Sequence, residues 1–225
     1  MRNINVGLIG FGTVGSGVAR GLIEKRAYLR RRLGVSVNLA KVCDLNFRKK
    51  RPVSLAKGVI TKDAYKIINN PDIDIIVELI GGINPAKEFI ISALNNKKHI
   101  VTANKALLSE EKKELFKVAD KNGVELRFEA SVAGGIPIIK ALREGLVANR
   151  VESIYGIING TCNYILSEMA DKDISFNIAL EQAKKKGFAE KRPVLDIEGH
   201  DSAHKLAILS SLAFGIDVKP KDIYM

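Results

Sequence analysis

Acidic, histidine and lysine side chains crowd the segment "DIEGHDSAHKLAIL", residues 196–209, which otherwise has the pattern of an apolar helix. Lys205 follows Asp201 by one helical turn, and a solvent-exposed ion pair at this spacing contributes only about 0.3–0.5 kcal/mol. However, Lys205 shares its helix face with Ile208, Leu209 and Leu212, so we expect it to point into a cleft and not into water. A lysine ammonium there can stabilise a developing alkoxide and deliver a proton to it. We therefore predict that Lys205 is catalytic.

Metal binding is the alternative chemistry for this segment. His200 and His204 have no further cysteine or histidine at ligand spacing, which favours a capping or packing role for both. The two cysteines, Cys43 and Cys162, also lack CxxC spacing, and we expect them to be free thiols in a reducing compartment.

A second chemical signal is "GFGTVG", residues 10–15, which matches the GxGxxG pattern of dinucleotide sites. It follows an apolar stretch and opens an amphipathic helix. In this context Gly10 permits a tight turn, Gly12 permits close approach of a pyrophosphate, and Gly15 lets the helix pack on the strand. The predicted cofactor loop consists of Gly10, Phe11, Gly12, Thr13, Val14 and Gly15.

Two features after the second predicted strand disagree about the cofactor. Asp44 ends that strand, where an acid would hold the ribose 2'-hydroxyl of NAD, although it lies further from the glycines than is usual. The basic run "RKKR", residues 48–51, follows closely, and Arg48 and Lys49 are positioned to clamp the 2'-phosphate of NADP. A solvated loop is the alternative reading of this run. NAD and NADP both stay open, and we expect NADP to be accepted at least as readily.

The stretch "HIVTANKALLS" places Lys105 just beyond a predicted parallel strand. The carboxyl ends of parallel strands form the edge at which such sheets bind ligands. Position alone does not distinguish a lysine of the site from an exposed one.

The elements that must position these residues alternate along the first part of the chain. Short apolar strands are predicted at 4–9, 35–44, 72–80, 99–103 and 124–130. One helix runs from the glycines through Leu33, another spans 85–98, and a third spans 109–123 with a Ser109 cap and a Gly123 stop. This βα alternation predicts a doubly wound parallel α/β sheet over residues 1–131.

After the glycine-rich turn "SVAGGIP" a second domain is predicted, over residues 132–225. It contains one predicted strand, "VESIYGIING", and three predicted helices, "CNYILSEMA", "FNIALEQAKKKG" and "SAHKLAILSSLAFG".

Composition excludes several classes of function. The formal net charge is +11, but the basic runs are scattered and carry no interleaved aromatics or nucleic-acid-binding motif, so we expect no nucleic-acid partner. No apolar run approaches the ~18 residues of a membrane helix, and the sequence starts without a cleavable leader. We expect a cytoplasmic protein with no membrane partner.

The blocks "GLIGFGTVGSGV", "HIVTANKALLS", "FEASVAGGIPII", "IYGIINGTCNYIL" and "GFAEKRPVLDIEGHDSAHKLAIL" resemble the homoserine dehydrogenase family in order and approximate spacing. The resemblance implies a Rossmann cofactor domain and an α/β substrate domain whose sheet builds a homodimer. It also implies NAD(P)-dependent interconversion of L-homoserine and L-aspartate 4-semialdehyde, on the route to threonine, methionine and isoleucine.

The resemblance also implies roles for single residues. Lys205 corresponds to a proton-donating lysine and Lys105 to a second active-site lysine. The implied substrate residues are Glu190, Asp201, Asp196, Gly160 and Thr161, and Gly187 would face the cofactor. A sodium ion is implied on main-chain oxygens of Glu129, Val132, Gly134 and Ile136.

This sequence departs from the family at its end, "DVKPKDIYM", where family members continue. We therefore expect the second domain to be incomplete. Another amino-acid dehydrogenase, of the aspartate or diaminopimelate type, is an alternative that the "ANK" and GxDxxxKL blocks disfavour. A non-catalytic dinucleotide- or nucleic-acid-binding protein is the remaining one.

Overall fold

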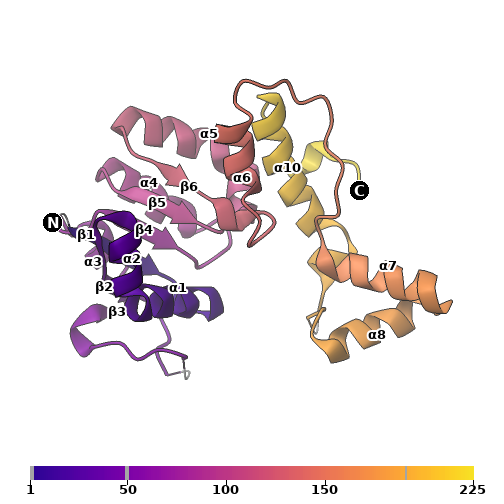
Figure 1. The fold of residues 1–225 in the computed structure, drawn as a ribbon, viewed down its shortest axis with the longest axis horizontal. Coiled ribbons are helices and arrows are strands. Elements are labelled where there is room, and N and C mark those ends of the chain that lie inside the picture. The colour runs from indigo at the N-terminus through magenta and orange to yellow at the C-terminus, as the bar shows by residue number, and fades with distance from the viewer. Residues whose placement is uncertain (1–2, 49–50, 191) are drawn as a thin grey trace. The chain divides into compact units, whose positions relative to one another are not determined.

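The computed structural model describes residues 3–48, 51–190 and 192–225. The chain divides into two compact units, residues 1–131 and residues 132–225 (Figure 1). Among the described residues, no helix is both long enough and apolar enough to cross a bilayer.

The first unit is built on one parallel sheet of six strands in the order β3-β2-β1-β4-β5-β6 (Figure 1). The strands are β1 (Asn3–Ile9), β2 (Ser36–Cys43), β3 (Ile60–Thr61), β4 (Ile75–Glu78), β5 (His99–Thr102) and β6 (Leu126–Arg127). This is the strand order of the dinucleotide-binding Rossmann fold, and the order reverses between β1 and β4. The predicted doubly wound α/β sheet is confirmed. Strand β3 was not predicted, because two residues leave no alternation to detect.

The pairing of β1 with β2 contains a bulge. Val6 pairs with Leu39 while Gly7 pairs with Lys41, so Ala40 is an extra residue on β2. The bulge explains why the apolar alternation of this strand slips by one residue before Val42.

The long helix predicted after the glycines is two helices, α1 (Thr13–Glu24) and α2 (Arg26–Leu33). Lys25, with φ −97° and ψ 14°, leaves the helical region between them. The buried residues of α1 are the small ones, Gly15, Ser16 and Ala19, whereas Val14 is 58% exposed. The helix therefore packs through its small residues, and Val14, which the apolar spacing of the sequence would place on the buried face, is exposed.

Helix α5 (Lys105–Asn122) begins earlier than the Ser109 cap predicted. The side chain of Asn104 accepts a hydrogen bond from the amide of Leu107, 3.2 Å away, and thus caps the helix. Ser109 is buried within the helix and donates to the carbonyl of Ala106. The predicted stop is confirmed, since Gly123 ends α5 in the left-handed conformation. The remaining elements of this unit are α3 (Tyr65–Ile68), α4 (Ala86–Asn95) and the 3₁₀ turns η1 (Lys57–Val59) and η2 (Glu129–Ser131).

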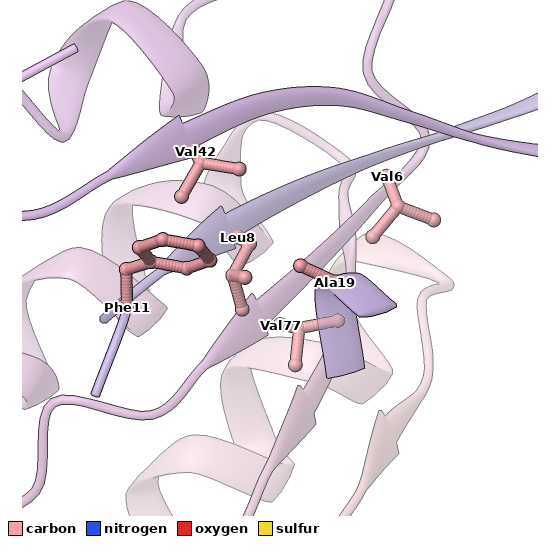
Figure 2. Close-up of a cluster of buried hydrophobic side chains, with 6 residues drawn as sticks. All are labelled: Val6, Leu8, Phe11, Ala19, Val42 and Val77. Carbon is pink, nitrogen blue, oxygen red and sulfur yellow. The ribbon is translucent and has the colours of Figure 1, made fainter. Parts of the chain in front are cut away.

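Buried apolar side chains from β1, β2, β4 and α1 form a core directly beneath the glycine turn (Figure 2). Phe11, from the turn itself, is only 3% exposed. The cluster consists of Val6, Leu8, Phe11, Ala19, Val42 and Val77.

All the regular elements in the described part of the second unit are helical. It contains α6 (Ile138–Lys140), η3 (Ala141–Gly145), α7 (Gly160–Lys172), α8 (Phe176–Lys186), α9 (Val194–Ile197), α10 (His200–Phe214) and η4 (Pro220–Asp222). The three predicted helices are confirmed as α7, α8 and α10. Gly187 and Gly215 end α8 and α10 in the left-handed conformation.

The strand predicted at residues 151–160 is wrong for this chain. Residues 151–159 form no strand, and Tyr155 and Ile157 are 92% and 77% exposed. A strand requires a neighbour to accept and donate its backbone hydrogen bonds. The described part of the second unit contains no such neighbour, and its expected α/β character is absent from residues 132–190 and 192–225.

The tight packing of α1 on β1 gives a stability prediction. A Cβ atom added at Gly15 would lie 2.0 Å from the carbonyl oxygen of Gly10, whereas one added at Gly17 meets nothing within 4 Å. We expect Gly15→Ala to lower the free energy of unfolding by about 1–3 kcal/mol through overpacking. Gly17→Ala, the matched control, should raise it by about 0.5–1 kcal/mol. Urea unfolding followed by circular dichroism measures both, and equal stabilities would contradict the packing argument.

Candidate functional site

The glycine turn between β1 and α1 leaves room for a ligand on one side only. Gly10 has φ +100°, and an added Cβ would lie 2.7 Å from the backbone of Leu79. At Gly12 an added Cβ meets nothing within 4 Å, so the backbone is open to close approach. Gly12 is also the N-cap of α1 and supplies no side-chain cap, which leaves first-turn amides available to an anion. Thr13 and Val14 continue this exposed edge.

A pocket of about 420 Å³ opens beside this turn, at the carboxyl ends of β1, β2 and β4. Its lining includes Gly10, Gly12, Asp44, Leu45, Ile80 and Gly81. The position at the reversal of strand order is where open α/β sheets bind ligands. Turn, helix end and pocket therefore fit a dinucleotide.

Asp44 fastens the glycine turn to the end of β2. One carboxylate oxygen accepts a hydrogen bond from the amide of Phe11 at 2.6 Å, and the other accepts from the amide of Asn46 at 2.7 Å. Burial raises the pKa of the preceding Cys43 thiol to about 11, with smaller contributions from Asp44 and Asp63. Cys43 is therefore an inert core thiol.

Of the basic run, Arg51 is the side chain placed on the glycine turn. Its Nε donates to the carbonyl of Phe11 at 2.6 Å, and its guanidinium carbon lies 5.9 Å from the centroid of the Phe11 ring. Arg48 is exposed, and its backbone amide donates to Asn46. Lys49 lies outside the described residues. The sequence pattern predicted Arg48 and Lys49 as phosphate ligands, and no local pattern distinguishes Arg51 from them.

Lys105 is the first residue of α5, directly after β5, and is half-buried. A buried hydrogen-bond network that the sequence did not indicate holds this corner. The carboxylate of Glu78, 0% exposed, accepts from the backbone amides of Ile80 and Gly81 and from the hydroxyl of Thr102. Thr102 in turn accepts from the amide of Asn104, whose side chain donates to the carbonyl of Gly82. The loops after β4 and β5 are thereby joined.

The second unit contains its own pocket, of about 630 Å³. Predicted residues in its lining are Gly160, Thr161, Gly187, Asp196, Asp201 and Lys205. The Lys205 ammonium lies 2.6 Å from a carboxylate oxygen of Asp201 and donates to the carbonyl of Ile158 at 2.7 Å. The side chains of Lys205 and Asp201 are 18% and 7% exposed, so this is no solvated surface pair.

Asn159 connects the two acids of this pocket, and sequence analysis missed it. Its amide nitrogen donates to a carboxylate oxygen of Asp196 at 2.8 Å and to one of Asp201 at 2.9 Å. Its carbonyl oxygen accepts from the amide of Cys162 and so caps α7. Thr161 hydrogen-bonds the other oxygen of Asp196 at 3.1 Å. An asparagine before a predicted helix is a recognisable cap, but the bridge between two acids has no sequence signal.

Other predicted residues lie outside these contacts. Glu190 is exposed and does not line the second pocket. His200 opens α10, and its Nε2 lies 3.3 Å from the carboxylate of Glu198, while His204 is half-buried on the same helix. Within the described ranges, no group of three or more His, Cys, Asp or Glu side chains gathers in a way that could hold a metal ion.

The residues predicted to bind sodium surround the junction of the two units in sequence. Glu129 opens η2, and Val132, Gly134 and Ile136 lie in the turn that follows. The carbonyl of Ile136 accepts from the amide of Ile138 at 2.8 Å.

Comparison with known families matches both units. The model for the NAD-binding domain of homoserine dehydrogenase matches residues 10–129, and the homoserine dehydrogenase model matches residues 137–225. The homoserine dehydrogenase of Neisseria gonorrhoeae is 48% identical over 225 residues, which are 100% of this chain and 52% of that protein. The chain thus spans about half the length of the curated relatives it matches.

Solved structures agree. A homoserine dehydrogenase from Thiobacillus denitrificans has a TM-score of 0.90 and 49% identity, covering 98% of this chain and 51% of that one. A putative homoserine dehydrogenase from Archaeoglobus fulgidus has a TM-score of 0.85 and 32% identity, covering 98% of this chain and 71% of that one. With both units matched in sequence and fold, the chain belongs to the homoserine dehydrogenase family.

Proposed function

We propose that this chain contributes the cofactor site and the proton-donating lysine of an NAD(P)-dependent homoserine dehydrogenase. The reaction interconverts L-homoserine and L-aspartate 4-semialdehyde. The observation that carries the proposal is the half-buried Lys205 ammonium, held beside Asp201 in a pocket that also contains Asp196. Family membership of both units supports it.

The chemistry requires a hydride and a proton. The nicotinamide of the bound cofactor supplies the hydride in aldehyde reduction and accepts it in the reverse direction. Lys205 stabilises the alkoxide oxygen and donates the proton, because its ammonium combines positive charge with a transferable hydrogen. Lys105, at the ligand-binding edge of the sheet, acts as the second lysine of the site.

Asp201 and Asp196 supply negative charge for the ammonium group of the amino-acid substrate. Two carboxylates face one lysine in this pocket, so an excess of negative charge remains for a cation. Gly160 and Thr161 provide the adjoining wall. We extend the substrate role to Glu190, a cofactor contact to Gly187, and sodium binding to the main-chain oxygens of Glu129, Val132, Gly134 and Ile136.

The cofactor loop consists of residues 10–15. An archaeal homoserine dehydrogenase with 24% identity and a TM-score of 0.79 was solved in complex with NADPH, which supports a phosphorylated cofactor. Arg51 hydrogen-bonds the loop at the carbonyl of Phe11, and we assign it the 2'-phosphate that the sequence pattern assigned to Arg48 and Lys49. NAD remains an accepted alternative.

We further propose a cytoplasmic homodimer formed through the second unit. Exposed apolar side chains on residues 151–159, including Tyr155 and Ile157, support an interface there. Two free cysteines, Cys43 and Cys162, are compatible with a reducing compartment.

The reaction is tested by mixing the purified full-length protein with NADP and L-homoserine and recording the absorbance of reduced nicotinamide; every activity measurement below uses the same full-length protein. We expect an increase with homoserine and none with L-aspartate or diaminopimelate. An increase only with one of the latter would favour another amino-acid dehydrogenase.

Substitution of Lys205 tests its role. We expect Lys205→Ala to lower turnover by roughly 10²- to 10⁴-fold, the range for loss of a general acid, with cofactor affinity nearly unchanged. Lys205→Arg should restore little, because a guanidinium keeps the charge but does not release its proton. Near-wild-type turnover in both variants would reduce Lys205 to an ion-pair partner of Asp201.

Gly12→Ala separates cofactor binding from folding. The added methyl group meets no protein atom within 4 Å, so the free energy of unfolding should change by less than about 1 kcal/mol. The same methyl group lies where a pyrophosphate approaches, and we expect NADPH affinity to fall at least about tenfold, or about 1.4 kcal/mol. Fluorescence titration with NADPH measures the affinity. Unchanged binding would place the dinucleotide elsewhere.

Arg51→Gln tests the phosphate contact. A hydrogen bond to a charged group is worth about 1.5–3 kcal/mol, so NADPH affinity should fall at least about tenfold. NADH affinity should stay the same and reports any damage to the glycine loop. Arg48→Ala is the matched control and should affect neither cofactor. Loss of NADPH binding in the control alone would return the role to Arg48.

A further inference from the structure

We infer that Asn159 is a positioning residue that holds Asp196 and Asp201 together as a receptor for an ammonium group. The inference rests on the proposed function for the identity of that cation. The geometry itself is independent of it, because a single amide nitrogen donates one hydrogen bond to each carboxylate, at 2.8 and 2.9 Å.

The amide of Asn159 offsets the repulsion between Asp196 and Asp201 and leaves both carboxylates charged. Two carboxylates held this close repel one another, and the repulsion grows where water is excluded. Asn159 is only 6% exposed, and its two N–H groups satisfy one oxygen of each acid. Because the amide is neutral, it stabilises the pair and leaves the charge available. A lysine or arginine here would occupy the place of the substrate's cation.

Among the described residues, the charged side chains in contact with Asn159 or with its two acids are two carboxylates and one ammonium. Asp196 comes from α9, and Asp201 and Lys205 come from α10. Burial, together with Asp196 and Asp201, raises the pKa of the Cys162 thiol on α7, so this thiol stays neutral. The ammonium of Lys205 contacts Asp201, and among the described residues no cationic side chain forms an ion pair with Asp196.

The neighbouring backbone completes the arrangement. The carbonyl of Ile158 accepts from the Lys205 ammonium at 2.7 Å, one residue before Asn159. Two consecutive residues therefore orient both acids and the lysine. Any shift of the segment that precedes α7 moves all three charged groups.

Asn159 has a second role, as the cap of α7, and the experiment must separate the two. Aspartate and serine cap helices about as well as asparagine does. Asn159→Asp keeps the accepting oxygen for the amide of Cys162 but replaces both donors with a third carboxylate. Asn159→Ser keeps the cap without adding charge, and its short side chain cannot bridge the two acids.

The kinetic experiment measures kcat and KM for L-homoserine in both variants between about pH 6 and about pH 9, where the protonation of a carboxylate cluster can change the rate. We expect KM to rise at least about tenfold in both, with NADPH affinity unchanged. For Asn159→Asp alone, the ratio of variant to wild-type kcat/KM should recover as the pH falls. A proton bound by the three-carboxylate cluster then restores one of the missing donors.

A stability measurement runs in parallel and needs no substrate. In the folded Asn159→Asp protein the crowded acids repel one another, which raises their pKa above that in the unfolded chain. The stability that the bound proton contributes is therefore present at low pH and is lost as the pH rises through the folded-state pKa. Urea unfolding should therefore show a deficit against wild type that widens from about pH 5 to about pH 8, and a constant difference for Asn159→Ser.

The two measurements fail separately. If the full-length wild-type protein does not turn over homoserine, the proposed function fails, and urea unfolding still decides whether the amide bridges the acids. Wild-type KM together with a pH-independent stability difference in Asn159→Asp would overturn the inference and leave Asn159 as a helix cap only.

Discussion

The close approach of β1 and α1 at the glycine turn is the constraint on which the first unit depends. Gly15 lies so near the carbonyl of Gly10 that no side chain fits between them. This contact brings the amino end of α1 against the sheet edge, where Asp44 ties the turn to β2. The buried side chain of Phe11 then anchors the turn in the core below. An anion-binding helix end at the reversal of strand order is the direct result.

The carboxylates of the two units have different hydrogen-bond partners, and the partners distinguish structural acids from acids that can bind a ligand. Asp44 accepts from backbone amides, and the buried Glu78 accepts from backbone amides and a hydroxyl, so both are fixed as structural links between loops. Asp196 and Asp201 instead share the side-chain amide of Asn159, and Asp201 also contacts Lys205. Carboxylate charge that backbone amides do not hold in place is available to a ligand, and Asp196 and Asp201 carry such charge in a pocket with Lys205.

Local patterns predicted the elements well where one residue type has one physical use. Gly123 ended α5 as predicted, and Gly187 and Gly215 end α8 and α10 in the same way, because the left-handed conformation strongly favours glycine. The predicted start of α5 was wrong because two nearby residues could each cap the helix. Asn104 and Ser109 are both good caps, and Asn104 was used because its amide also reaches the carbonyl of Gly82. The prediction of a strand at 151–160 was wrong for another reason. An alternating pattern reports only the preference of the side chains, whereas a strand also needs a neighbouring strand for its backbone hydrogen bonds.

The sequence by itself determined the parallel α/β order of the first unit, the glycine turn, and the presence of Lys205 on a partly apolar helix face. These follow from periodicity and from the conformational freedom of glycine, which act over a few residues. Only the tertiary structure decided that Arg51 reaches the turn where Arg48 does not, that Glu78 joins two loops, and that Asn159 bridges Asp196 and Asp201. Each of these contacts joins residues 20 or more positions apart, and whether two distant side chains meet depends on how the chain packs and not on the residues beside them.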